Sequence, residues 1–239
     1  MTAPSTLSDA RLVGHGRPGR NAFVLADLAA LVAMVSVLAA LWLVALRPRM
    51  GSQSSLTQCL ANLSRVNRAV LAYADDQGHV LPSADPKAPG ELQWWYKEQV
   101  KQHAGLTGQS SERDSLFACP DDRGYTDAKP FWSSPRFDFG SYNFNGVQIP
   151  GAPNIAGWKT SAISDPRRTL LTMEWTAHGP LSWHRSRTGS RNLPFYRDAE
   201  SVVGFVDGHV ALTPIYYDGF TAAYLRDPVP GYGYRYSGR

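Results

Sequence analysis

The sequence predicts an α+β protein in which a long N-terminal helix packs on an antiparallel sheet, and three observations predict it. An uncharged apolar run occupies residues 28–46, a stripe of helical period follows from Leu56 to Tyr73, and β-rich flanks enclose Asp207 and Gly208. With 239 residues and 43% hydrophobic content, the chain is long enough for one or two compact domains and too apolar for disorder. We expect one domain beyond the apolar helix.

The first element is the apolar run, in which Ser36 is the only clearly polar residue. A helix of this length spans about 28 Å at 1.5 Å per residue, which matches the hydrocarbon core of a bilayer. A cleaved secretory signal has a shorter apolar core, and this run ends in Arg47-Pro48-Arg49 instead of a small-residue cleavage site. The run therefore predicts a single transmembrane helix.

The next element is a second, amphipathic helical stretch. Apolar residues recur there in steps of three and four, at Leu56, Cys59, Leu60, Leu63, Val66, Val70 and Tyr73. That spacing places them on one face, which we expect to pack on the domain. Gly78 and Pro82 should end the helix.

A short amphipathic helix is predicted from Glu91 to His103, with Gly105 as its stop. Trp94 and Trp95 within it are read as core residues, with a sugar-stacking platform as the alternative. Further along, residues 169–174 read as a strand and residues 202–213 as a hairpin, because Asp207-Gly208 lies between β-rich flanks. Such a two-residue turn requires positive φ at both positions.

The region around the apolar run resembles the N-terminal segment of type IV pilins and of type II secretion pseudopilins. The resemblance rests on a basic leader, on Phe23-Val-Leu-Ala-Asp27-Leu and on the apolar helix that follows. Two positions depart from the pattern: Ala22 stands where the family has Gly before the cleavage point, and Asp27 stands where it has Glu. Cleavage by a prepilin peptidase between Ala22 and Phe23 is therefore left open.

Shorter elements in the same order along the chain are similar to pseudopilin-like families of planctomycetes and verrucomicrobia. They are Cys119-Pro-Asp-Asp122, Ser141-Tyr-Asn-Phe-Asn145, the segment 163–174 and Val203-Gly-Phe-Val-Asp207-Gly-His-Val210. Arg197 stands where a common form of these families has a His.

The resemblance implies a pilin-like fold and a division of the chain into five segments. These parts are a leader-like segment (1–22), a transmembrane helix (23–46), the soluble half of a stem helix (47–78), a globular α+β domain (79–215) and a Tyr/Gly-rich tail (216–239). It implies a structural assembly protein of a type II secretion or pilus-like system, anchored once in the bacterial inner membrane with its domain in the periplasm. The partners would be other pilin-like subunits, membrane lipid and prepilin peptidase. For the tail, we prefer a mobile segment to an interface.

Asp27 is the residue to which the resemblance gives a role in assembly. In the family, the equivalent carboxylate is thought to pair with the N-terminal amine of a neighbouring subunit. An interfacial Asp that reaches water among the lipid headgroups is the alternative, and both stay open.

Cys59 and Cys119 are the only cysteines of the chain, and they lie 60 residues apart. An oxidising compartment would permit a disulfide that contributes about 4 kcal/mol in the chain-entropy model. Two buried free thiols are the alternative, and the sequence does not decide between them.

No cofactor is predicted, and the identity of any metal is unknown from the sequence. The candidates for a Ca²⁺ site are Asp207 with Asp198, Glu200 or Asp218, because hard cations take clustered carboxylate oxygens. A triad of His178, His184 and His209 is a further candidate, although these residues lack the spacing of two zinc ligands on one helix face.

The chain lacks a nucleophile elbow, a phosphate-binding loop and a dinucleotide fingerprint, so we do not predict an enzyme. Its net charge of +4 is spread along the length without a dense basic block, which argues against a nucleic-acid partner.

Two alternative functions stay open. One is an uncleaved membrane-anchored module that binds glycan, a cation or a secretion partner. The other is a tethered hydrolase using a pair drawn from Asp121, Asp122 and Glu174.

Overall fold

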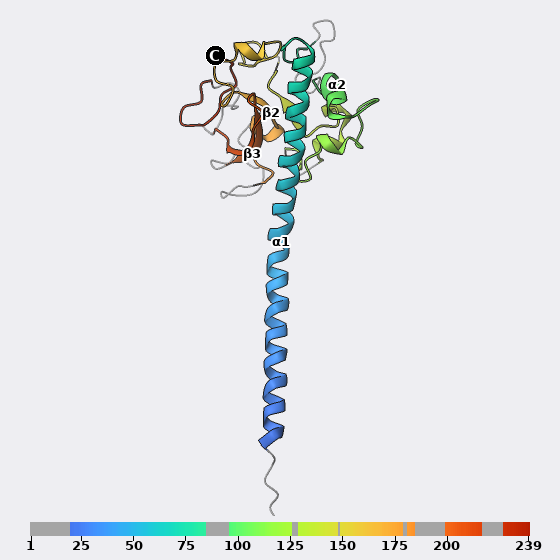
Figure 1. The fold of residues 1–239 in the computed structure, drawn as a ribbon, viewed down its shortest axis with the longest axis vertical. Helices are drawn as coiled ribbons and strands as arrows, with labels where there is room; N and C mark the ends of the chain where they lie inside the picture. Colours follow the sequence, from blue (N-terminus) through green and yellow to red (C-terminus); the bar gives the residue numbers. More distant parts are fainter. Residues whose placement is uncertain are drawn as a thin grey trace, which may run out of the picture. The chain divides into compact units, whose positions relative to one another are not determined.

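A computed structural model of the chain describes residues 20–84, 96–125, 129–147, 149–178, 181–184, 199–216 and 227–239; for residues 20–25 and 43–53 it gives the helical backbone without the side chains. Helix α1 (Arg20–Asp76) is the longest element (Figure 1). Internal contacts divide the chain between Met50 and Gly51, within α1, and each part is described by itself. The other elements are α2 (Tyr96–Val100), η1 (Lys101–Ala104), η2 (Ser115–Phe117), η3 (Phe131–Ser133), η4 (Pro135–Phe137), β1 (Tyr142–Phe144), η5 (Thr160–Ala162), β2 (Leu170–Glu174), η6 (Trp175–His178), β3 (Glu200–Phe205) and β4 (Val210–Pro214).

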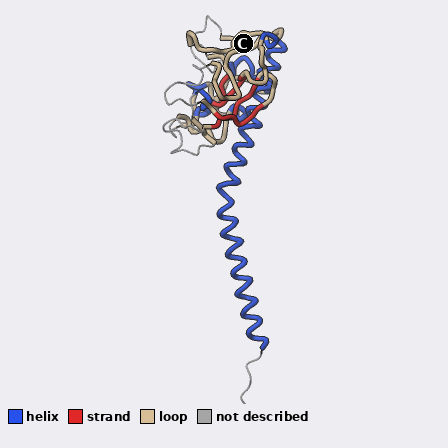
Figure 2. The backbone as a smooth tube through the Cα atoms, turned by 90° about the vertical axis from the view of Figure 1, so that its left-hand side faces the viewer, coloured by secondary structure: helices blue, strands red, loops and turns tan. Residues whose placement is uncertain are grey.

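Strands β1 to β4, red in Figure 2, belong to one antiparallel sheet. Their order in it is β1-β2-β3-β4. Met173 at the centre of β2 lies opposite Asn143 of β1 and Val203 of β3, and Val203 lies opposite Ala211 of β4. The predicted α+β class is confirmed in this respect. The predicted strand at 169–174 and the hairpin at 202–213 are confirmed with it.

The hairpin turn differs from the prediction in its length and its backbone. Strand β3 ends at Phe205 and β4 begins at Val210, so the connection is longer than a two-residue turn. Gly208 has a φ of 98°, whereas Asp207 has negative φ. The Asp207 carboxylate accepts a hydrogen bond from the backbone N–H of His209, at 3.1 Å. The expectation of positive φ at both positions is wrong, because this longer loop needs it only at the glycine.

The C-terminal part of α1, from residue 54 to residue 76, packs on the sheet with the predicted face. Cys59, Leu63, Val66 and Val70 are fully buried in one cluster that also contains residues of β2 and β3. Leu56, Leu60 and Tyr73 pack against the edge of this cluster. The helix ends at Asp76, and Gly78 has a φ of 68°, as expected of a glycine that follows a helix. The predicted stripe is confirmed.

Asn67 joins this helix to the sheet by two side-chain hydrogen bonds. Its Oδ1 accepts a hydrogen bond from the Thr172 hydroxyl at 2.7 Å, and its Nδ2 donates one to the carbonyl of Phe205 at 3.0 Å. Gly204 permits this close approach, because a Cβ there would lie 2.5 Å from Asn67 Oδ1. A buried amide satisfied on both sides fixes the register of the helix on the strands.

A second core forms around β2 and β3 and includes residues near the end of the sequence. Tyr234 and Tyr236 are buried in it, and the Tyr236 hydroxyl donates a hydrogen bond to the carbonyl of Ala177 at 2.8 Å. The N–H of Leu170 donates a hydrogen bond to the carbonyl of Arg235 at 3.0 Å. The prediction of a mobile tail is wrong for residues 227–239, since their tyrosines fill a core. Residues 217–226 of that predicted tail lie outside the described residues.

The helix predicted from Glu91 to His103 is helical over its described part, in α2 and η1. Gly105 ends it in the left-handed conformation with a φ of 79°. Trp94 and Trp95 lie outside the described residues.

The predicted membrane span is contradicted. Among the residues that the structure describes, no helix is long and apolar enough to cross a membrane. This finding overturns the transmembrane helix at 23–46, the single-pass inner-membrane location with a periplasmic domain, and the pilin-like fold with a transmembrane stem.

Candidate functional site

The described part of the chain brings together a buried ionic cluster beside a pair of cysteines. His184 lies at its centre. Its Nε2 is 2.7 Å from Oε1 of Glu174, and its Nδ1 is 2.8 Å from Oδ2 of Asp121. The side chains of Glu174 and His184 are 0% and 1% exposed, and that of Asp121 is 23% exposed. A single imidazole therefore joins two carboxylates from distant parts of the chain.

Each carboxylate has a further partner that holds it in place. Glu174 is the last residue of β2, and its Oε2 accepts a hydrogen bond from the N–H of Val202 on β3 at 2.8 Å. Asp121 Oδ2 accepts a second hydrogen bond, at 2.8 Å, from the hydroxyl of Ser55 on α1. The sheet thus orients one side of the cluster, and α1 orients the other.

The short segment 181–184 carries His184 into the cluster and is tied down on both sides. The guanidinium of Arg123 donates hydrogen bonds to the carbonyls of Ser182 and Trp183, at 3.2 and 3.1 Å. The indole N–H of Trp183 donates a hydrogen bond to the carbonyl of Gly124 at 3.0 Å. These contacts with residues 123–124 keep the imidazole close to Asp121.

The electrostatics of the cluster favour a protonated imidazole. Burial by itself would lower the pKa of His184, but the carboxylates of Glu174 and Asp121 outweigh burial and raise that pKa to about 9. Burial would raise the pKa of Asp121, and the hydrogen bonds from His184 and Ser55 instead lower it. At neutral pH the cluster therefore holds an imidazolium between its anionic partners.

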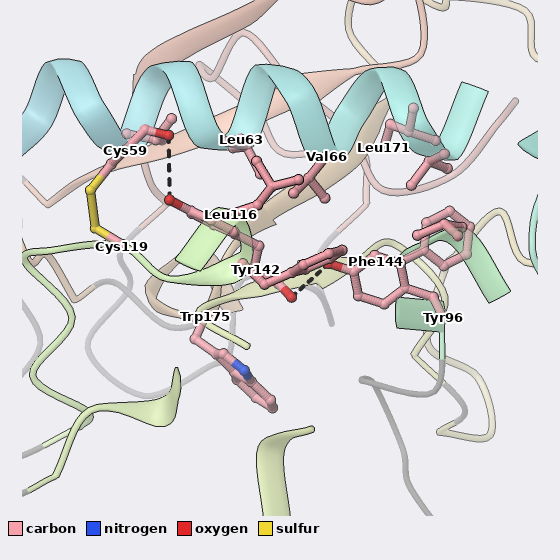
Figure 3. Close-up of a cluster of buried hydrophobic side chains, with 14 of the residues drawn as sticks. Cys59, Leu63, Val66, Tyr96, Leu116, Cys119, Tyr142, Phe144, Leu171 and Trp175 are labelled. Atoms are coloured by element: carbon pink, nitrogen blue, oxygen red, sulfur yellow. Dashed lines mark hydrogen bonds between the residues drawn. A yellow bond between two sulfur atoms is a disulfide. The ribbon is translucent and has the colours of Figure 1, made fainter. Parts of the chain in front are cut away.

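Cys59 of α1 and Cys119 form a disulfide, with their Cα atoms 5.0 Å apart (Figure 3). The structure thus has the bridge that the sequence left open. Around it, the hydroxyl of Tyr142 donates a hydrogen bond to the carbonyl of Cys59 at 3.4 Å (Figure 3). Sγ of Cys119 lies 3.9 Å from Nε2 of His184, so the bridge borders the ionic cluster.

General-base hydrolysis is not what this arrangement favours. A base must reach the proton that it removes and must be unprotonated when it acts. The side chain of His184 is 1% exposed, and its pKa of about 9 keeps it charged at neutral pH. Glu174 is buried, and both its carboxylate and that of Asp121 are engaged by the ring of His184. Asp121 and Glu174, two of the residues considered for a hydrolytic pair, are thus brought together, but both pair with the charged ring of His184.

The other predicted sites are not assembled among the described residues. Asp207 contacts His209 in the hairpin turn, while Asp198, Asp218 and Arg197 lie outside the described residues. His178 is buried beside Asn143, and the ring of His209 stacks on Phe205 with centroids 4.2 Å apart. These two histidines do not join His184 in the group of metal-binding residue types that the described chain contains.

The second candidate site is the exposed apolar segment of α1, which we define as residues 26–42. Its nine large apolar side chains are each 55% to 70% exposed; they are Leu28, Leu31, Val32, Met34, Val35, Val37, Leu38, Leu41 and Trp42. Asp27 is exposed in the same segment. Ala22 and Phe23, the predicted processing residues, lie in α1, but their side chains are outside the described part.

An open pocket of about 250 Å³ lies beside the C-terminal part of α1, lined by Arg65, Arg68, Ala69, Ala72, His103 and Ala104. Its volume is below the roughly 300 to 1,000 Å³ of typical small-molecule sites. His103 is already paired with Asp76 at 3.0 Å. The pocket therefore gives little support to a ligand-binding module.

Comparisons with protein-family models, with curated proteins and with solved structures found no match. The two candidate sites are accordingly interpreted from their own geometry.

Proposed function

We propose that the protein is a structural subunit that assembles with further copies of itself through the exposed apolar segment of α1, and that it has no catalytic role. The observation that carries the proposal is the exposure of nine large apolar side chains on one helical segment. A contiguous apolar surface of this kind marks an interaction site in a folded protein.

The segment also carries a stripe of small residues suited to a close helix contact. Ala29, Ala33, Ser36 and Ala40 recur in steps of four, three and four, so they share one face. The hydroxyl of Ser36 donates a hydrogen bond to the carbonyl of Val32 at 2.8 Å, so it brings no unpaired donor to that face. Small residues let two helix backbones approach closely.

A second copy is the occupant that matches this surface best. The partner must offer an uncharged apolar helix face, and within the described chain that property belongs to this same segment. Large side chains on the opposite face would be covered by additional copies, as in a helical bundle. An assembly of this kind agrees with the structural role that the sequence resemblance implies. A place in a type II secretion or pilus-like system stays a prediction from the sequence.

The test is the association of the full chain and of two variants that each introduce one phenylalanine into the segment. Ala33→Phe places a bulky ring on the small stripe, whereas Val35→Phe places one on the opposite face. We expect sedimentation velocity to show association of the unmodified chain, weakened at least tenfold by Ala33→Phe and little changed by Val35→Phe.

Cross-linking gives the same comparison a second measurement. Ala33→Cys should form covalent dimers under mild oxidation, and Leu31→Cys, on the opposite face, should form far fewer. A chain that stays monomeric in the ultracentrifuge, or that partitions into phospholipid vesicles with both phenylalanine variants behaving alike, would refute assembly through the small stripe.

A further inference from the structure

Four side chains of types that bind transition metals converge at the disulfide. They are Cys59 from α1, Cys119 from the loop after η2, Glu174 from the end of β2, and His184. One potential ligand atom from each lies within 4.8 Å of the other three. In the oxidised protein the two sulfur atoms are bonded to each other and are not available as thiolates.

We propose that the protein, once the Cys59–Cys119 disulfide is reduced, binds one Zn²⁺ ion through both cysteine sulfurs, Nε2 of His184 and Oε1 of Glu174. Two thiolates, an imidazole and a carboxylate form a ligand set that zinc accepts in tetrahedral geometry. The soft sulfur ligands select zinc over the Ca²⁺ considered from the sequence.

The ring of His184 is already oriented as a zinc ligand requires. A metal-bound histidine typically donates its other ring N–H to a carboxylate or carbonyl. Nδ1 of His184 lies 2.8 Å from Asp121, whose carboxylate is in turn held by the Ser55 hydroxyl. This arrangement directs Nε2 toward Cys119, 3.9 Å away.

Glu174 is oriented in the same manner. Its Oε2 is held by the N–H of Val202, which leaves Oε1 directed into the cluster. Both non-sulfur ligands thus have one atom fixed by the protein and the other facing the cysteines. The burial of Glu174 and His184 keeps competing water away from them.

The movements required are small. In a tetrahedral zinc site with the usual bond lengths, two sulfurs lie about 3.8 Å apart, and a sulfur lies about 3.5 Å from a nitrogen. The present separation of 3.9 Å between Cys119 Sγ and His184 Nε2 is close to that value. The cysteine sulfurs must move apart once their bond is broken, and Nε2 must separate from Oε1 of Glu174, now 2.7 Å away, by about 0.7 Å.

The chemical step balances with a named reductant. A water-soluble phosphine donates two electrons to the disulfide, takes up the oxygen of one water and becomes a phosphine oxide, while the sulfurs become two thiols. Binding of Zn²⁺ then releases the two thiol protons and the Nε2 proton of the imidazolium. In a cell, two small-molecule thiols would serve as the reductant and form their own disulfide.

The experiment uses the full chain with Co²⁺ as the spectroscopic probe for zinc. After reduction by the phosphine and anaerobic desalting, we expect one equivalent of Co²⁺ to give a thiolate-to-cobalt charge-transfer band and the strong visible absorption of a tetrahedral site. One equivalent of Zn²⁺ should remove both. The oxidised protein should give neither signal.

Variants separate the full site from the cysteines alone. His184→Gln and Glu174→Gln should each weaken Co²⁺ binding or remove the tetrahedral spectrum, and Asp121→Asn should weaken binding about ten- to a hundredfold through the orientation of the ring. His209→Gln, a histidine outside the cluster, is the matched control and should bind like the unmodified chain. Far-ultraviolet circular dichroism checks that each variant is folded.

Reduced, folded protein that binds no Co²⁺ would overturn the proposal. So would Co²⁺ binding that His184→Gln and Glu174→Gln leave unchanged, since the metal would then be held by thiols without the buried cluster. Neither outcome bears on the proposed association through residues 26–42, because that association does not involve the cysteines.

Discussion

The two described stretches of α1 are both rich in apolar residues, yet their surroundings differ. From residue 26 to residue 42, the large apolar side chains stand around the helix and are more than half exposed. From residue 54 to residue 76, apolar side chains keep to one face, and that face is buried against the sheet. The periodicity of the apolar residues, more than their number, decides which stretch is buried within the same chain. An apolar stripe on one side of a helix can pack on the sheet while the polar opposite face stays in water. The stretch without a polar face needs a partner from elsewhere.

The largest effect should come from the disulfide, which ties the packed stretch of α1 to Cys119. Reduction in the presence of a chelator should lower the free energy of unfolding of the domain by about 4 kcal/mol, from the entropy of the loop that the bridge closes. Urea denaturation followed by tryptophan fluorescence, with and without a phosphine, measures it. A Cys59→Ser/Cys119→Ser chain should show no response to the phosphine. A change below about 1 kcal/mol in the unmodified chain would mean that the bridge adds little to the packed stretch.

One leucine in each stretch gives the most direct comparison. Leu63→Ala should cost about 3 kcal/mol of unfolding free energy, because it opens a cavity in a fully buried cluster. Leu38→Ala, where the side chain is 55% exposed, should change the free energy by less than about 0.5 kcal/mol. Urea denaturation at a protein concentration too low for association measures both. Equal costs would show that the two stretches do not differ in the way described.

Acid should loosen the domain through His178, which faces the amide of Asn143, the ring of Tyr236 and the backbone of Trp175. Burial lowers the pKa of His178 to about 4, against about 6.5 in the unfolded chain. The neutral ring is favoured by the fold, so its contribution is present above pH 6.5 and is lost as the pH falls toward 4. We expect a loss of about 2 kcal/mol between pH 7 and pH 5.

The control for this pH dependence is His178→Gln, which removes the titrating ring. Its unfolding free energy should fall less than that of the unmodified chain between pH 7 and pH 5, when both are followed by urea denaturation. Parallel profiles for the two chains would show that His178 does not sense the pH in this range.

The smallest effect tests how closely the packed stretch approaches the sheet. Gly204→Ala should cost about 1 to 2 kcal/mol, because its Cβ would lie 2.5 Å from Oδ1 of Asn67 and 2.8 Å from Oγ1 of Thr172. Gly233→Ala is the control, since nothing lies within 4 Å of a Cβ there. Thermal unfolding of the two variants compares them. A Gly204→Ala chain as stable as Gly233→Ala would indicate that the helix and strand separate readily.

Local patterns predicted much of the fold. The stripe from Leu56 to Tyr73 and the flanks of Asp207-Gly208 are periodic signals within single elements, and such signals are carried by neighbouring residues alone. The ionic cluster could not be found in this way, because Ser55, Asp121, Glu174 and His184 come from four separate segments. Glu174 and His184 were both considered as site residues, but sequence spacing carries no sign that they meet.

The end of the chain shows a second limit of local patterns. The tyrosines and glycines near residues 231–236 are typical of mobile termini, and the aromatic rings could be placed only by knowing the second core they enter. The disulfide was equally undecided, since a separation of 60 residues says nothing of the distance between two sulfurs.

The bond between Asn67 and Phe205 joins positions 138 residues apart. Contacts with such separations form only after a long loop has closed, so this topology implies slow folding. During that delay the exposed apolar segment of α1, residues 26–42, is already present in a newly made chain, whereas the domain is still incomplete. A chaperone that shields this segment would raise the yield of folded protein without speeding the folding itself.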